Sequence, residues 1–312
     1  MSRPATVRPF APMPSHRRQW LRGLSASGAA LFAGRAAAQD AAPHDAAAPV
    51  PLPGTQAFDM RSRGGRDYRV FVAEPSAAAP AGGRPVLLFT DGNAYFGAAA
   101  SLVRLPSMPG AAGAVPLVVG IGYPGDAPLH LERRTFDLVP APTALGAEEG
   151  VRLGARPGGA DAFLAFLLDE LLPALAARHA VDARRVSLAG HSLGGLFALH
   201  ALLERPAAFH SIAAISPSIW VNEPALLVGA EALAAAPRLP ARVLLAVARD
   251  EVPGHPERSR RMLSTARAMH GRLRPLRARG LQARLLELDD ENHMSTFICT
   301  LPAILRQAGA TA

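Results

Sequence analysis

The sequence contains a single cysteine, Cys299, and no lysine, so all 33 of its basic residues are arginine. One cysteine excludes any disulfide bond within the chain, and the stability of the fold therefore has to come from an apolar core. The 312 residues are 49% hydrophobic and 19% charged, which is the composition of a globular protein. This length suits one large α/β domain or two small ones.

Acidic residues are absent from the first 38 positions, which hold six arginines and account for most of the formal net charge of +8. In the rest of the chain 27 arginines oppose 25 acidic residues, so this part is close to neutral. Nucleic-acid-binding proteins usually carry a concentrated basic patch. The one candidate is the stretch 256–280, which we expect to form a solvated helix face, so no nucleic-acid partner is predicted. Its arginines are Arg258, Arg260, Arg261, Arg267, Arg272 and Arg274.

The N-terminal segment lacks an apolar run long enough to cross a bilayer, since residues 24–33 fall short of the about 20 that a spanning helix needs. Arg17-Arg18 precedes this run and small residues at 36–38 follow it. The arrangement predicts a twin-arginine export signal over residues 1–38, with an amphipathic surface helix as the alternative. We therefore expect contact with the twin-arginine translocase, a periplasmic mature protein and no stable membrane insertion. The Ala- and Pro-rich residues 39–55 are typical of a flexible linker.

The body of the chain alternates strand-like and helix-like segments and shows no internal repeat. Residues 84–92 and 115–125 are continuous apolar runs, as in strands buried on both faces of a parallel sheet. Further strands are expected at 67–75, 185–189, 210–218, 241–250 and 283–290, and helices after Asp161, after Ser192, at 256–278 and at the C-terminus. The stretches 126–160 and 221–240 are expected to be loops. The alternation predicts an α/β protein with a mostly parallel central sheet and helices on both faces.

Residues 190–194, Gly-His-Ser-Leu-Gly, fit the pattern G-x-S-x-G between a strand-like and a helix-like run. In such an elbow the serine takes an unfavourable backbone conformation that projects its hydroxyl above the sheet. The alternative is a glycine turn that serves packing alone. The flanking elements favour Ser192 as a nucleophile, with the amide of Leu193 facing the developing oxyanion. The loop after residue 90 predicts a second amide, that of Asn93, with a plain Asp-Gly turn as the alternative.

A serine hydroxyl needs a base to remove its proton. His293 follows the last predicted strand, at the carboxyl edge of the sheet, where hydrolases with this chain order carry their base. The supporting acid has to lie between the two and after a strand, which leaves Glu251 as the first choice and Asp250 as the second. A Ser–His dyad is the remaining alternative.

Six stretches occur in the order seen in esterase-D-like α/β-hydrolases: DGNAYF, IGYPGD, RRTFDLVP, AGHSLGGLFALHALLERPAAF, SPSIWVN and ENHMS. Over residues 56–305 the chain most resembles the trilactone esterases that hydrolyse catecholate siderophores such as enterobactin, salmochelin or bacillibactin. The resemblance implies an α/β-hydrolase fold for the domain 56–312. It also implies that Glu251 matches the glutamate of the family's GELE-like stretch, although the surrounding letters here are ARDE.

The resemblance further implies two substrate-binding residues, Arg134 and Trp220. Arg134 belongs to an R-x-x-D pattern and could hold a carbonyl, phenolate or carboxylate, or instead pair with Asp137 and brace its loop. Trp220 could pack against an aromatic ligand or form a pocket wall, and Val221 replaces the family's second tryptophan.

The sequence thus predicts a periplasmic serine esterase that acts on a small-molecule ester through an acyl-enzyme, with no metal and no cofactor. A catecholate siderophore trilactone is the substrate that the resemblance favours. The alternatives are a general carboxylesterase, a thioesterase or an acyltransferase for small acyl or aryl esters. A binding protein that has lost catalysis is a third hypothesis, disfavoured because Ser192 and His293 are both present.

Overall fold

The computed structural model describes residues 50–105, 113–141, 157–240 and 242–311. The predicted export signal at 1–38 and most of the predicted linker at 39–55 lie outside these residues. Residues from Val50 onward form one compact unit. None of the helices described is both long and apolar enough to cross a membrane.

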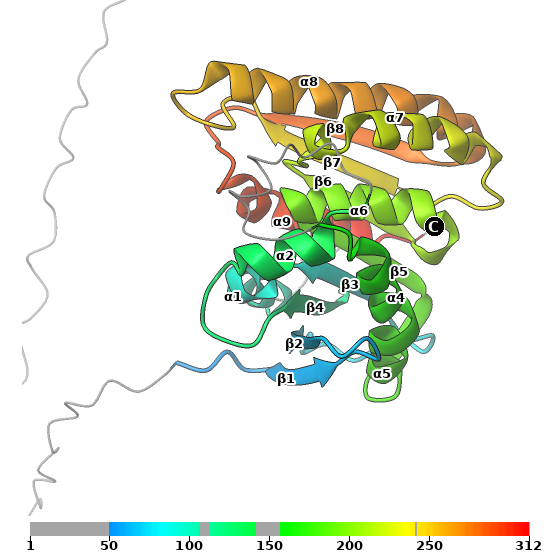
Figure 1. Cartoon of the computed structure of the whole chain (residues 1–312). Coiled ribbons are helices and arrows are strands. Elements are labelled where there is room, and N and C mark those ends of the chain that lie inside the picture. Colours follow the sequence, from blue (N-terminus) through cyan, green and yellow to red (C-terminus); the bar gives the residue numbers. More distant parts are fainter. Residues whose placement is uncertain (1–49, 106–112, 142–156, 241, 312) are drawn as a thin grey trace, which may run out of the picture. The chain divides into compact units, whose positions relative to one another are not determined.

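Eight strands form one sheet in the order β1-β2-β4-β3-β5-β6-β7-β8 (Figure 1). Their bounds are β1 Thr55–Arg61, β2 Asp67–Ala73, β3 Arg84–Thr90, β4 Leu117–Gly122, β5 Val181–His191, β6 Ser211–Ile215, β7 Arg242–Ala248 and β8 Gln282–Leu288. β2 pairs antiparallel with β1 and β4, and every other pair of neighbours is parallel. The mostly parallel sheet is therefore confirmed, and its central strands are the continuous apolar runs because helices cover both faces.

The helices cover the two faces of the sheet unequally. Alternate residues of each strand point to opposite faces, and Leu87 and Phe89 pack with α1 and α9 whereas Val86 and Leu88 pack with the other helices. The helices are α1 Gly92–Val103, α2 Leu131–Leu138, α4 Ala160–Phe166, α5 Leu172–Ala176, α6 Leu193–Glu204, α7 Glu223–Ala232, α8 Pro256–Leu273 and α9 Thr296–Gly309. A π-helical turn, η1 Leu167–Leu171, joins α4 to α5. The prediction of helices on both faces is confirmed.

Two stretches expected to be loops contain helices. α2 lies within 126–160, and its buried residues include Arg134, Thr135 and Asp137, polar side chains that do not mark a core-facing helix in the sequence. α7 lies within 221–240, where a proline in the first turn is compatible with a helix. The segment after β3 is likewise the start of α1 and not a loop. The helix expected after Asp161 is α4, which has Gly159 at its N-cap position, and the Asp161 side chain binds His200 at 2.7 Å.

The turn between β5 and α6 has the strained geometry that the pattern predicts. Ser192 has φ 57° and ψ −115°, which is uncommon for a residue with a side chain. A Cβ atom on Gly190 would lie 2.1 Å from the carbonyl oxygen of Gly194, and one on Gly194 would lie 2.1 Å from Thr90 Oγ1. Both glycines therefore allow the close approach of β3, β5 and α6 that places Ser192 above the carboxyl edge of the sheet.

Candidate active site

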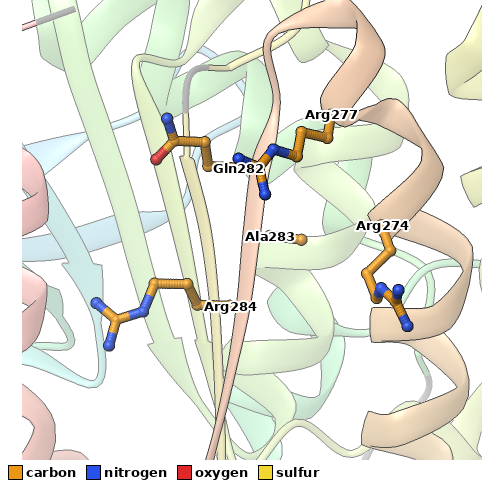
Figure 2. A pocket seen from close by; sticks show the side chains of 5 residues that line it. All are labelled: Arg274, Arg277, Gln282, Ala283 and Arg284. Carbon is orange, nitrogen blue, oxygen red and sulfur yellow. The ribbon is translucent and has the colours of Figure 1, made fainter.

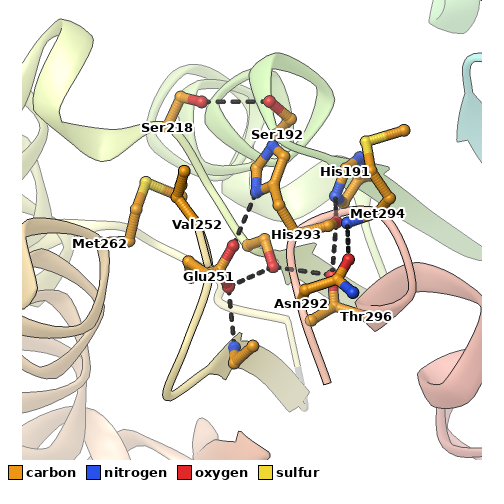
Figure 3. Close-up of polar contacts among 12 residues, drawn as sticks. His191, Ser192, Ser218, Glu251, Val252, Met262, Asn292, His293, Met294 and Thr296 are labelled. Atoms are coloured by element: carbon orange, nitrogen blue, oxygen red, sulfur yellow. Dashed lines mark hydrogen bonds and ion pairs between the residues drawn. The ribbon is translucent and has the colours of Figure 1, made fainter. Parts of the chain in front are cut away.

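Three of the predicted residues meet at the carboxyl edge of the parallel sheet (Figure 3). Ser192 follows β5, Glu251 comes three residues after β7, and His293 comes five residues after β8. Ser192 and His293 line one pocket of about 260 Å³. The chain order of nucleophile, acid and base thus becomes a spatial cluster because parallel strands end at the same edge.

Ser192 is fixed by the strand next to its own. Its amide donates to the carbonyl of Ile215 at the end of β6 (3.0 Å), and its carbonyl accepts from the amide of Ser218 (3.0 Å). The hydroxyl oxygens of Ser192 and Ser218 lie 3.3 Å apart. Ser218 could not be found from the sequence, since a serine in a Ser-Pro-Ser turn carries no signal of its own.

Glu251 holds the imidazole of His293. Its Oε2 lies 2.6 Å from His293 Nδ1, and its carbonyl accepts from the His293 amide at 2.9 Å. The second oxygen, Oε1, accepts from Ser216 Oγ (2.6 Å) and from the Ala248 amide (2.7 Å). The Glu251 side chain is fully buried, so these hydrogen bonds replace the water that the carboxylate loses.

Asp250 does not reach His293. Its side chain is exposed and accepts a hydrogen bond from Ser259 Oγ at 3.2 Å. Of the two candidate acids, the structure brings Glu251 and not Asp250 to the base. With Nδ1 bound to a carboxylate, His293 keeps Nε2 free for the pocket side, which is the tautomer that a general base for a serine requires.

His191, the variable residue of G-x-S-x-G, binds the backbone of His293. Its Nε2 lies 2.6 Å from the carbonyl oxygen of His293, and its Nδ1 lies 2.9 Å from the Tyr95 hydroxyl. A carbonyl can only accept, so the ring proton is on Nε2 and Tyr95 donates to Nδ1. Burial, together with the charge of nearby His293, lowers the pKa of His191 to about 3, so this ring stays neutral. Its role was not predictable from the sequence, where it is only a variable position of the motif.

Asn93 and Leu193 stand in the first turns of α1 and α6, whose amides have no partner within their own helices. These helices follow the neighbouring strands β3 and β5, so their N-termini lie at the same edge. The Asn93 side chain is fixed because its Oδ1 accepts from the Tyr123 amide at 2.8 Å and its Nδ2 donates to the Tyr123 carbonyl at 3.0 Å. Both amides are therefore available to an anion at this edge.

Arg134 does not line the pocket. It is 5% exposed, and its Nε and Nη2 donate to the two carboxylate oxygens of Asp91 at 2.8 and 2.9 Å. The alternative, a pairing with Asp137, does not occur either, because Asp137 pairs with Arg66 at 3.0 Å. A bidentate buried pair leaves the guanidinium little freedom to meet a substrate. The structure instead shows Arg134 bracing Asp91, whose φ of 58° sets the start of α1.

Trp220 is half-buried and lines the pocket, together with Arg258 and Arg261 from α8. Both arginines are exposed, as expected for a solvated helix face, and they also line the pocket. The signal that could have found them is their spacing of three residues at the start of a helix that follows β7, because this places both side chains on one face near the carboxyl edge.

A larger hollow of about 390 Å³ lies elsewhere, against the amino-terminal end of the edge strand β8 (Figure 2). Its lining residues are Arg274, Arg277, Gln282, Ala283 and Arg284. Gln282 is the first residue of β8, so this hollow opens at the end of the strand opposite to His293. Its position sets it apart from the cluster around Ser192.

The low pKa of His191 makes a prediction about stability. A histidine in the unfolded chain has a pKa of about 6.5. Below that pH the unfolded state therefore binds a proton at His191, whereas the native state does not. Stability should therefore fall as the pH drops from about 6.5 toward 3. In His191→Gln, which can keep both hydrogen bonds without titrating, the loss between pH 7 and pH 5 should be about 2 kcal/mol smaller.

Urea unfolding of both proteins at pH 7 and pH 5 measures this difference. The buried ring of His210, whose pKa is also lowered, is present in both proteins and cancels. Equal losses in the two proteins would show that His191 is protonated in the native state.

Comparison with known proteins identifies the family of this chain. The Esterase family, described as "Putative esterase", matches residues 62–308. Ferri-bacillibactin esterase BesA of Bacillus subtilis (strain 168) is 34% identical over 264 residues, which cover 82% of this chain and 90% of that protein. Two solved structures are similar: the BES protein from Bacillus cereus (28% identity, TM-score 0.74, covering 85% of this chain and 98% of that one) and the enterobactin hydrolase IroE in complex with DFP (26%, 0.63, covering 82% and 95%). The chain therefore belongs to this esterase family and is a carboxylic ester hydrolase.

Proposed function

We propose that the protein is a serine esterase that works through an acyl-enzyme, with Ser192 as nucleophile, His293 as general base and Glu251 as the supporting acid. The observation that carries the proposal is the 2.6 Å contact of Glu251 with His293 at the pocket that Ser192 also lines. A carboxylate, an imidazole and a strained serine at one sheet edge form the constellation that activates a hydroxyl for acyl transfer.

In this mechanism Ser192 Oγ attacks the ester carbonyl while His293 Nε2 takes the hydroxyl proton. Glu251 stabilises the imidazolium that forms, and the amides of Leu193 and Asn93 donate to the tetrahedral oxyanion. The intermediate collapses when the C–O bond of the ester breaks and His293 gives its proton to the leaving alcohol. Water then repeats the sequence on the acyl-serine and releases the acid. The chain's own residues make every proton transfer, so the proposal calls for no cofactor.

We propose a catecholate siderophore trilactone as the substrate. The similar proteins named as a ferri-bacillibactin esterase and an enterobactin hydrolase support this choice. The half-buried ring of Trp220 in the pocket wall also supports it, since an indole face can pack against an aromatic arm.

A second candidate is an esterase, thioesterase or acyltransferase for small acyl or aryl esters. The observation in its favour is the pocket of about 260 Å³, which lies just under the volume at which sites for drug-sized ligands begin, about 300 Å³. Such a pocket accommodates one acyl or aryl group.

Export by the twin-arginine route to the periplasm is also part of the proposal. It rests on Arg17-Arg18, the short apolar run and the small residues at 36–38, all outside the described residues. Replacing both arginines by lysine should keep the protein in the cytoplasm and leave its precursor uncleaved, whereas Arg22→Lys should not. Immunoblots of cell fractions check this, and a processed periplasmic form of the double variant would refute the assignment.

Glu251→Gln should lower kcat/KM for an aryl ester by roughly 10²- to 10⁴-fold, because an amide can no longer stabilise the imidazolium. Asp250→Asn, one residue away, is the matched control and should stay within about threefold, since Asp250 contacts Ser259 and not His293. Steady-state hydrolysis of p-nitrophenyl acetate measures both. Comparable losses of kcat/KM in the two variants would refute the assignment of Glu251 as the supporting acid.

A substrate panel separates the two candidate functions. Iron-loaded and iron-free enterobactin should be hydrolysed with kcat/KM at least about tenfold above that for p-nitrophenyl butyrate, because binding of the extra arms contributes to transition-state stabilisation. Chromatography of the products provides the measurement, with Ser192→Ala as the inactive control. Faster turnover of the simple aryl ester would favour the second candidate.

A further inference from the structure

One wall of the Ser192 pocket is cationic. Arg258 and Arg261, three residues apart on α8, line it together with Trp220 and Met262. Among the described residues, none that lines this pocket carries a carboxylate. An entering ligand therefore meets two guanidinium groups close to the reactive serine.

These two arginines form no ion pair within the part of the chain that the structure describes. Two other arginines of the same helix do, since Arg267 binds Glu287 at 2.7 Å and Arg272 binds Glu231. Arg258 also lies in the first turn of α8, where the helix dipole disfavours a cation. Such a departure from local preference is typical of a functional position.

The cation of Arg261 is held at a defined place relative to the nucleophile. Its guanidinium carbon lies 5.1 Å from the centroid of the Trp220 ring, a cation–π arrangement that leaves the N–H groups on its edge for a ligand. Trp220 belongs to the short helix η3, Ile219–Val221, which follows Ser218. The Ser218 amide donates to the Ser192 carbonyl at 3.0 Å, so the stacked pair is tied to the elbow.

We propose that Arg258 and Arg261 select substrates whose aromatic group carries a negatively charged oxygen next to the scissile ester. Trp220 supplies a face for the ring and the two guanidinium groups bind the anionic oxygen. This inference deepens the function proposed above and rests on it for the identity of the ester. Iron-loaded catecholate arms, whose oxygens are deprotonated, belong to the class of substrate that this wall fits.

Benzoate and benzamide test the inference, because they share one shape and differ in charge. The sequence has two tryptophans, Trp20 and Trp220, so in the full chain with Trp20→Phe the fluorescence excited at 295 nm comes from Trp220 alone. Titration in low-salt buffer at pH 7 should show benzoate binding about fivefold or more tightly than benzamide. This preference should shrink as added salt screens the charges.

In Arg258→Gln/Arg261→Gln on the same background, benzoate and benzamide should bind equally. Arg260→Gln, which removes a cation outside the pocket lining, is the control and should keep the preference. Equal binding of the two ligands to the parent protein, or a preference that survives in the double variant, would overturn the inference. The titration involves no turnover, so it tests the two proposals separately. If the protein prefers benzoate but does not hydrolyse trilactones, the proposed substrate is refuted and the selection of anionic aromatic groups by Arg258 and Arg261 is retained.

Discussion

The Glu251 carboxylate is fully buried, so both of its oxygens have to be satisfied by protein groups. Its partners come from three strand ends: Ser216 after β6, the Ala248 amide at the end of β7 and His293 after β8. Moving any one of these ends would remove a hydrogen bond from a buried charged group, at a cost of about 1.5–3 kcal/mol. The position of His293 therefore depends on the whole carboxyl half of the sheet and not on its own loop alone.

Backbone strain gathers at the same edge. Among the described residues, the non-glycine residues with positive φ are Asp91, Ser192, Ser216 and Asp290, and each closely follows a strand. Strained residues persist only where their surroundings hold them. Three of the four have visible restraints: the Arg134 pair holds Asp91, the Ile215 carbonyl binds the Ser192 amide, and Ser216 binds Glu251. The turn at Ser192 is thus one of several strained turns that lie at the carboxyl edge of the sheet and are held by neighbouring contacts.

The sequence was sufficient to predict the features that depend on patterns of hydrophobic residues or on the order of motifs along the chain. Continuous apolar runs identified the buried strands, and chain order placed Ser192 and His293 at one edge. It could not choose between Glu251 and Asp250, because adjacent residues differ only in the direction that a turn gives them. It could not find the Asp91 partner of Arg134, which is 43 positions away, because a buried ion pair leaves no periodic trace. It predicted that Arg258 and Arg261 are exposed, but not that they line the pocket, because an exposed arginine beside a pocket looks like any other in sequence.

The base arrives with the last strand of the sheet, and α9, which follows it, packs against β5, β6 and β7. Chains fold as they are synthesised, from the N-terminus onward. A nascent chain that already carries Ser192 at its elbow still lacks the β8 edge, the His293 loop and the helix that supports them. In the mechanism proposed above, the serine therefore has no partner to take its proton until the His293 loop and α9 have been synthesised.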